Sequence, residues 1–258
     1  MSNIDIQVSD GVMHLVLQRP ERKNALTSHM YEDLAAALDR AQADTAVHVV
    51  LLYGAQGVFT AGNDLDDFVE NKPTSPDASV FRFMRSIAMF NKPVIAAVQG
   101  LAIGIGTTML LHCDLVYVAQ NTKFSLPFVN LGLVPEAASS LLLPRLAGHQ
   151  RAMEKLLFGD VFTADDALAL GFVNRVLPAD EVLPFAQQQA QRLATLPAGS
   201  VRGTKSLAKG RVGQGSNDAV TRINEEATLF IQRVGGPATL EAIAAFKAKR
   251  KPDFSGKD

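Results

Sequence analysis

One acidic residue in an apolar stretch is the first candidate for chemistry in this sequence. Glu136 lies in Leu133–Ser140 (LVPEAASS), among apolar and small residues. A carboxyl group in such surroundings is a candidate general base, because burial raises its pKa and makes the carboxylate a stronger base. A structural role is also open, since Pro suits the first position of a helix and Glu in the first turn complements the helix dipole.

Two glycine-containing loops are the second candidate. Thr60–Asp64 (TAGND) and Gly100–Gly106 (GLAIGIG) each follow a predicted buried strand. Glycine lets the backbone turn tightly and approach a ligand, and free N–H groups at a helix start can face an anion or a polarised oxygen. Both loops could instead be simple strand-to-helix turns. The glycines of the second loop do not follow the G-x-G-x-x-G pattern, which argues against a dinucleotide cofactor.

The elements that must position these residues alternate between strand and helix up to about residue 177. Asp10-Gly11 predicts a hairpin, and Thr27 or Ser28 can cap a helix that runs to Ala43. The apolar runs predict strands over Val47–Tyr53, Pro93–Gln99, Asp114–Ala119 and Val173–Val176, with a short one at Lys123–Leu126. Further helices are predicted over Ala78–Phe90, Pro135–Leu143, Gln150–Phe158 and Thr163–Leu170, and almost throughout from Asp180. An α/β core followed by a helical part is therefore expected.

The composition limits the classes of protein to which the chain can belong. Of 258 residues, 47% are hydrophobic and 20% charged, and the net charge is −1. We therefore expect a globular protein with no attraction to nucleic acid or membranes. The five histidines and Cys113 form no recognised metal-ligand spacing, so no metal is expected. No apolar run is long enough to span a membrane, and neither end resembles a targeting signal, so a cytoplasmic location is expected.

Several stretches carry a family resemblance when they are taken together in order. They are Arg19–Thr27 (RPERKNALT), Phe59–Leu65 (FTAGNDL), Lys92–Gly106 (KPVIAAVQGLAIGIG), Asp114–Ala119 (DLVYVA), Phe124–Gly148 and Ala167–Asn174. With this order and spacing, essentially the whole chain resembles the crotonase family, the enoyl-CoA hydratase/isomerase superfamily. The resemblance implies an α/β spiral of ββα units over residues 1–197 and a C-terminal helical trimerisation region over residues 198–258.

The assembly implied by the resemblance is a homotrimer or a dimer of trimers. The helical tail from Ile223 to Lys251 agrees with this expectation, because it carries apolar stripes for which the predicted α/β core offers few partners. The first stripe contains Ile223, Ala227, Phe230 and Ile231, and the second contains Leu240, Ile243 and Ala244.

The substrate implied by the resemblance is an acyl-CoA thioester, with no cofactor besides the coenzyme A that the substrate carries. The thioester oxygen is expected to bind the backbone N–H groups of Asn63 and Ile105. Two such pre-aimed donors stabilise an enolate more than the neutral carbonyl. The residues implied to bind the substrate are Arg22, Lys23, Ala25, Ala61, Gly62, Asp64, Leu65, Gly104, Phe246 and Lys249. The three basic residues among them are candidate phosphate partners, although ordinary surface charge is an equal alternative.

Two departures from the family pattern bear on the reaction. Hydratases of the family carry two glutamates that activate water, and the matching positions hold Thr108 and Phe128. Phe cannot take a proton, and a Thr hydroxyl is a poor base near neutral pH. Glu136 remains, and its context resembles that of the base in peroxisomal-type Δ3,Δ2-enoyl-CoA isomerases, which move a proton from C2 to C4. An apolar acyl pocket would then be lined by Leu101, Leu126, Phe128 and Val134, with Thr108 beside the substrate.

Three functions remain open from the sequence. The first is a Δ3,Δ2-enoyl-CoA isomerase with Glu136 as its only base. The second is a hydratase or other lyase that acts through residues not identified by the pattern. The third is an acyl-CoA-binding protein without catalytic activity, because a family scaffold can lose its chemistry and keep its pocket. The sequence does not determine the length or type of the acyl chain.

Overall fold

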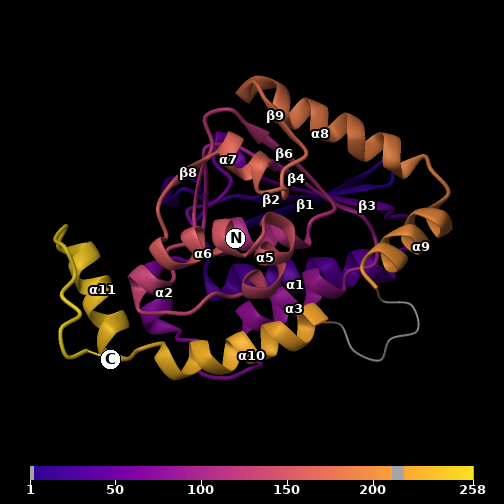
Figure 1. Cartoon of the computed structure of the whole chain (residues 1–258). Coiled ribbons are helices and arrows are strands. Elements are labelled where there is room, and N and C mark those ends of the chain that lie inside the picture. The colour runs from indigo at the N-terminus through magenta and orange to yellow at the C-terminus, as the bar shows by residue number, and fades with distance from the viewer. Residues whose placement is uncertain (1–2, 211–217, 258) are drawn as a thin grey trace.

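The main sheet has six strands in the order β1-β2-β3-β4-β6-β9 (Figure 1). The computed structural model describes residues 3–210 and 218–257. β1 and β2 form the predicted antiparallel hairpin, and every other neighbouring pair in this sheet is parallel. The strands are β1 (Ile4–Ser9), β2 (Val12–Leu17), β3 (Val49–Gly54), β4 (Val94–Val98), β6 (Leu115–Ala119) and β9 (Arg175–Leu177).

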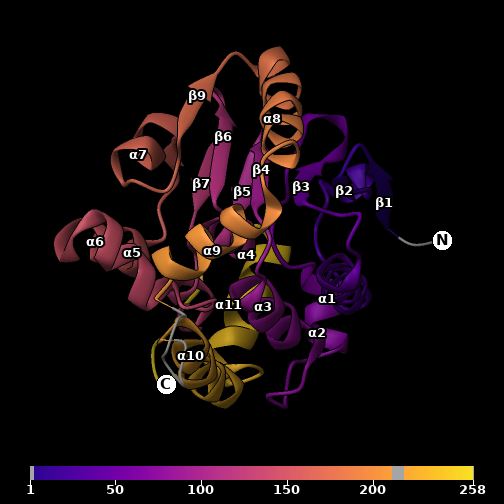
Figure 2. The same ribbon diagram turned by 90° about the vertical axis from the view of Figure 1, so that its right-hand side faces the viewer.

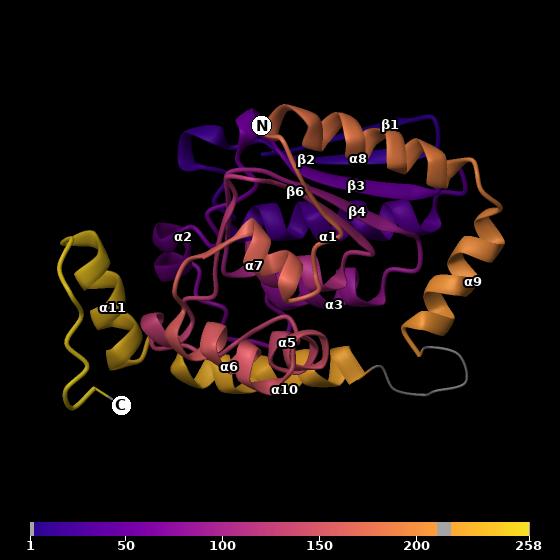
Figure 3. The same cartoon turned by 45° about the horizontal axis from the view of Figure 1, so that its top comes forward.

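Helices cover both faces of this sheet, because successive residues of each strand point to opposite sides. Helix α8 (Ala179–Ala194) packs on one face, whereas α1 (Ser28–Ala43) and α3 (Ser79–Met89) lie on the other (Figure 3). Along β3, Val49 and Leu51 belong to the cluster that contains α8, and the alternate residues belong to the larger core with α1 and α3. The predicted cap of α1 is confirmed, since the side chain of Thr27 accepts the Met30 N–H.

A second, three-stranded sheet has the order β5-β7-β8 and stands apart from the first. Its strands are β5 (Leu101–Ile103), β7 (Lys123–Ser125) and β8 (Phe162–Thr163). The consecutive strands β4 and β5 lie in different sheets, as do β6 and β7, which is the spiral of ββα units expected from the resemblance. The strand β5 was not predicted, because its three residues lie between glycines that suggested a loop.

The remaining helices pack around these sheets. They are α2 (Leu65–Glu70), α4 (Ile105–Thr108), α5 (Ser139–Ala147), α6 (His149–Phe158), α7 (Ala164–Ala169), α9 (Ala198–Ala208), α10 (Asp218–Arg233) and α11 (Pro237–Lys247). Short 3-10 segments cover Pro20–Arg22, Ala55–Gly57, Met109–His112 and Val129–Leu131. Within residues 3–210 and 218–257, no helix is both long and apolar enough to cross a membrane.

The C-terminal helices differ in how they use their apolar faces. Helix α10 packs against α3 and α5 (Figure 2), and its Ile223, Ala227 and Phe230 are buried in the main core. The first predicted stripe of the tail therefore has its partners within the same chain. On α11, Leu240 and Phe246 are 46% and 67% exposed. The division into a core over residues 1–197 and a trimerisation region over 198–258 stays a prediction.

The helix predicted over Pro135–Leu143 begins later than expected, at Ser139. The residues Ala137 and Ala138 have φ values of 55° and 56°, which lie in the left-handed region. A right-handed helix cannot include such residues. Glu136 therefore lies in a turn before α5 and not in the first turn of the helix.

The two glycine-containing loops are held against each other by backbone hydrogen bonds. Thr60 pairs with Ala102 in an isolated bridge, and the Thr60 N–H donates to Leu101 O at 2.9 Å. Two glycines make this approach possible. A Cβ on Gly62 would lie 2.7 Å from Ile103 O, and one on Gly106 would lie 2.5 Å from Thr60 Cγ2.

We expect Gly62→Ala to destabilise the fold by about 3 kcal/mol, because it combines a strained φ of +88° with a backbone clash. Urea unfolding monitored by circular dichroism measures the change. Gly57→Ala is the matched control, since Gly57 has a φ of +71° but nothing within 4 Å of an added Cβ. Equal losses in the two variants would show that the close contact between the loops contributes nothing.

Candidate active site

Two cavities meet at Glu136. The first, which we call the polar cavity, has a volume of about 280 Å³ and is lined by Leu26, Ser28, Tyr31, Asn63, Asp64, Asp67, Phe68, Asn71, Lys72, Pro73, Ala78, Ser79, Val80, Glu136 and Phe230. The second, the apolar cavity, has a volume of about 400 Å³ and is lined by Ala61, Gly62, Asn63, Leu65, Ile103, Gly104, Pro127, Phe128, Asn130, Leu131, Leu133, Glu136, Phe230, Ala242, Phe246, Arg250 and Pro252. Three residues border both cavities, namely Asn63, Glu136 and Phe230.

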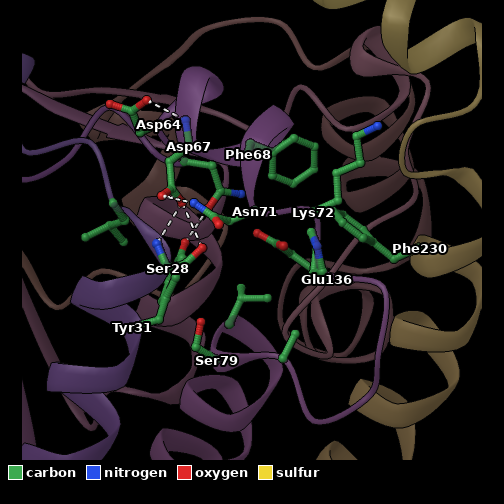
Figure 4. Close-up of a pocket in the computed structure, with 15 residues that line it drawn as sticks. Ser28, Tyr31, Asp64, Asp67, Phe68, Asn71, Lys72, Ser79, Glu136 and Phe230 are labelled. Carbon is green, nitrogen blue, oxygen red and sulfur yellow. Dashed lines mark hydrogen bonds between the residues drawn. The ribbon is translucent and has the colours of Figure 1, made fainter.

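The carboxyl group of Glu136 is buried, with 1% of the residue exposed. Figure 4 shows it pointing across the polar cavity toward Ser28, Tyr31 and Asn71. Its Oε1 atom has no hydrogen-bond partner among the described residues. Burial, and then the charge of Glu226, raise the pKa of Glu136 to about 8. A carboxylate with such a pKa is a far stronger base than an exposed one.

Two backbone N–H groups at or next to the apolar cavity are free to bind a ligand, since Asn63 lines this cavity and Ile105 follows the lining residue Gly104. The Leu26 N–H donates a hydrogen bond to Gly62 O, and Leu26 O accepts one from the Asp64 N–H, both at 2.8 Å. Asn63 lies between these two bonded residues, so its own N–H points away from Leu26. Ile105 is the first residue of α4, where a helix has no internal acceptor for its N–H. Within the described parts of the chain, neither N–H has an acceptor. Each of them is therefore available to donate a hydrogen bond to a ligand oxygen.

A buried tyrosine fixes the side chain of Asn63. The Tyr31 hydroxyl donates a hydrogen bond to Asn63 Oδ1. Burial, and then the charges of Glu136 and Asp67, raise the pKa of Tyr31 well above its usual value, so the phenol keeps its proton. The ring of Tyr31 also packs against Phe83, with 5.7 Å between the ring centres. The tyrosine thus links α1 and α3 to the loop that carries a free N–H.

The carboxylates of Asp64 and Asp67 are occupied by structural contacts. Asp64 caps α2 and accepts from Arg19 at 2.7 Å and Arg22 at 3.3 Å. Burial raises the pKa of Asp64, but these bonds and the N–H groups that it caps outweigh burial and lower the pKa to about 2. Asp67 accepts two bonds from Ser28, each 2.8 Å long, and one from Asn71 at 2.9 Å. Among the carboxyl groups that line the cavities, Glu136 is therefore the one suited to accept a proton.

Comparison with known proteins places this chain in a family. Residues 7–257 match the sequence profile described as Enoyl-CoA hydratase/isomerase. The chain belongs to this family, the crotonases. It is an enzyme of the hydratase/isomerase type within that family.

Individual crotonases resemble the chain over nearly its whole length. The 1,2-epoxyphenylacetyl-CoA isomerase of Escherichia coli is 37% identical over 97% of each chain. The enoyl-CoA delta isomerase 2 of Rattus norvegicus is 34% identical over 94% of this chain and 62% of its own length. Among solved structures, an enoyl-CoA hydratase/isomerase from Pseudoalteromonas atlantica has a TM-score of 0.91 and 39% identity, covering 98% of this chain and 100% of that one.

The structure places some of the residues predicted from the crotonase resemblance at the cavities. Glu136 and Asn63 border both cavities, Asp64 lines the polar one, and Ile105 lies beside the lining residue Gly104. The apolar cavity is lined by the predicted residues Ala61, Gly62, Leu65, Gly104, Phe128 and Phe246.

Other predicted residues lie away from both cavities. Leu101, Leu126 and Val134 border neither, so of the four residues of the expected apolar acyl pocket only Phe128 lines one of these two cavities, and the pocket itself stays a prediction. Leu126 is in the hydrophobic core. Thr108 is fully buried, and among the described residues its hydroxyl has no hydrogen-bond partner. The buried Ala25 and the exposed Arg22, Lys23 and Lys249 also line neither cavity.

Two residues of the site were not identified from the sequence. Tyr31 follows the core residue Met30 in an amphipathic helix, and this pattern is typical of an ordinary core aromatic residue. Glu226 lies in α10, 90 residues after Glu136, where a glutamate usually indicates an exposed helix face. It is 5% exposed, and burial raises its pKa to about 7 even though the bonds from Ser140 and Ala138 and the charge of Arg222 lower it. The sequence did carry a signal for its burial, because Glu226 lies on the same face of the helix as the apolar residues Ile223, Ala227 and Phe230.

We expect Asp64→Asn to lower the free energy of unfolding by about 2 kcal/mol at pH 7, because Arg19 loses its charged partner. The pKa of Asp64 lies below its usual value, so this contribution is present above about pH 4 and is lost as the pH falls through about 2. Urea unfolding at a series of pH values measures it. Asp66→Asn is the control, since Asp66 is exposed and its loss should matter much less. A stability difference that does not depend on pH would contradict this account.

Proposed function

We propose that the chain is a Δ3,Δ2-enoyl-CoA isomerase in which Glu136 is the only base. The observation that carries the proposal is the position of Glu136, a buried carboxyl group on the border of two cavities. Its pKa of about 8 suits proton abstraction near neutral pH. The cavities also contain Asn63, whose free N–H can share the charge that develops on a thioester oxygen.

In the proposed reaction, the pantetheine arm of coenzyme A lies in the apolar cavity and the acyl chain passes Glu136 into the polar cavity. The thioester oxygen accepts hydrogen bonds from the N–H groups of Asn63 and Ile105. The Glu136 carboxylate removes a proton from C2, and the electron pair of that C–H bond delocalises over a dienolate. The same carboxyl group returns the proton at C4, which leaves the double bond between C2 and C3. The reaction needs no cofactor besides the coenzyme A of the substrate.

The residues at the two hydratase positions support isomerisation over addition of water. Phe128 lines the apolar cavity with a ring that cannot accept a proton, and Thr108 lines neither cavity. The other cavity carboxylates, Asp64 and Asp67, are engaged by arginine, serine and asparagine side chains. Among the described lining residues, a second uncommitted carboxylate that could activate water is therefore missing.

We also propose that the chain assembles as a homotrimer or a dimer of trimers. Large apolar side chains at the end of α6 support this, since Leu157, Phe158 and Val161 are 51%, 62% and 65% exposed. We expect static light scattering at micromolar concentration to give a mass of three or six chains of 27.7 kDa. A monomer under these conditions would contradict the assembly without affecting the assignment of the base.

We expect Glu136→Gln to lower the turnover of a 3-enoyl-CoA at least about 100-fold, because it keeps the size of the side chain and removes the base. Binding of the substrate, measured by calorimetry, should stay nearly unchanged. In the wild type, kcat/KM should rise with pH up to about 8, since the base acts in its ionised form.

Thr108→Ala is the control and should cost much less than Glu136→Gln. Near-normal isomerase turnover in Glu136→Gln would show that the base lies elsewhere. A wild type that rapidly hydrates a 2-enoyl-CoA and leaves the 3-enoyl-CoA unchanged would favour the hydratase. Binding of acyl-CoA with neither reaction would favour a protein that only binds the thioester.

A further inference from the structure

The turn that carries Glu136 has a backbone conformation that its own sequence does not favour. Ala137 and Ala138 are both left-handed, with φ values of 55° and 56°. Each such residue without glycine's freedom costs about 1–2 kcal/mol. Alanine has no polar side chain with which to stabilise the turn locally. Contacts from elsewhere in the fold must therefore hold it.

Two buried side chains from distant elements supply these contacts. The Glu226 carboxylate of α10 accepts hydrogen bonds from the Ala138 N–H at 2.6 Å and from the Ser140 N–H at 3.1 Å. It also accepts a hydrogen bond from the Ser140 hydroxyl at 2.6 Å. His112 lies on the other side, with its Nε2 atom 2.7 Å from Ala137 O. A carbonyl oxygen only accepts hydrogen bonds, so this nitrogen carries the proton.

Helix α10 is itself held firmly where it supplies Glu226. One turn further along, Phe230 makes edge-to-face contacts with Phe68 and Phe81, with 6.0 Å between the ring centres in each case. Phe230 also forms a wall of both cavities. The helix thus contacts the site at two points, through the turn and through the cavity wall.

We propose that Glu226 is a positioning residue that locks the turn between Pro135 and Ser140 and holds the Glu136 carboxyl group at the border of the cavities. The inference rests on the proposed role of Glu136 as the base. Glu226 itself lines neither cavity, so it acts through the turn and not on the substrate.

The surroundings of Glu226 act on its charge in two directions. Burial is the larger effect and raises its pKa to about 7. Three hydrogen bonds from Ala138 and Ser140 favour its carboxylate, as does Arg222 on the same helix. From α3, the charged group that reaches α10 is Arg85, whose Nη1 is 3.5 Å from Asn224 Oδ1. On the side of Glu136, the Tyr31 phenol of α1 lies close enough for the charge of Glu136 to raise its pKa, and His112 Nε2 is 2.7 Å from Ala137 O. The charge of Glu226 raises the pKa of Glu136 further than burial alone does.

The test is Glu226→Gln, which keeps the length of the side chain but removes its charge and part of its accepting capacity. We expect kcat for a 3-enoyl-CoA to fall at least about 10-fold, since a small displacement of a catalytic group has large effects. KM, and the Kd of saturated butyryl-CoA, should change less than about 2-fold. The acidic limb of kcat/KM should move to lower pH, because the pKa of Glu136 falls when the neighbouring charge is removed.

Glu225→Gln is the matched control, because it makes the same change of charge one residue away. Glu225 is exposed and pairs with Arg222 at 2.9 Å, so its substitution should leave kcat and the pH limb unchanged. If Glu226 only caps α5, Glu226→Gln should lower the melting temperature and leave both kcat and the acidic limb of the pH profile unchanged. That outcome would overturn the positioning role.

Ser140→Ala tests the same idea with a smaller change, and it decides the matter if Glu226→Gln does not fold. It removes the 2.6 Å hydroxyl bond to Glu226 and keeps both backbone bonds. We expect a loss in kcat of about 3-fold with KM unchanged, the size of one hydrogen bond of modest net strength. An unchanged kcat in Ser140→Ala, with an unchanged pH limb, would overturn the inference.

A second readout separates this inference from the proposed reaction. Exchange of the C2 protons of butyryl-CoA in D₂O, followed by NMR, needs the base and the oxyanion donors but no double bond. If the wild type exchanges these protons without isomerising a 3-enoyl-CoA, the isomerase assignment fails. Slower exchange in Glu226→Gln would then still support the positioning role. If isomerisation proceeds and Glu226→Gln matches the wild type in both assays, the positioning role alone fails.

Discussion

The site depends first on the contact between the two loops that follow β3 and β4. The pairing of Thr60 with Ala102 brings together segments about 40 residues apart, and Gly62 and Gly106 allow the backbones to approach. Without this contact the lining residues of the two loops, such as Asn63 and Gly104, would not border a common cavity. The parallel sheet contributes by ending β3 and β4 at the same edge, so that both loops emerge side by side.

A second requirement is a carboxyl group that is buried without being neutralised by a partner. Burial makes Glu136 basic, but a buried acid with a free oxygen atom destabilises the fold. Among the described carboxyl groups this occurs at Glu136. The neighbouring acids are fixed by different means, with an arginine for Asp64 and N–H and hydroxyl donors for Glu226. The chemical difference between these acids thus comes from their partners and not from the residue type.

Much of the fold could be predicted from the sequence, because its signals are local. The hairpin at Asp10-Gly11, the Thr27 cap and the apolar strands β3, β4 and β6 are confirmed, whereas the strand predicted over Val173–Val176 lies later, at Arg175–Leu177. The start of α5 was predicted wrongly, since Pro-Glu is a good helix beginning and the left-handed alanines depend on Glu226, far away in the chain. The residues that border the cavities were partly missed for the same reason. Motifs identify the loops, but the polar wall around Tyr31 is formed by packing of α1, α2 and α3.

Helix α10 has an implication for how such an enzyme could diversify. Two adjacent turns of this helix present Glu226 to the turn before α5 and Phe230 to both cavities. A substitution that shifts the helix to admit a bulkier ligand would also disturb the geometry of the carboxyl group. Changes in ligand size and changes in reactivity are therefore linked traits in this chain.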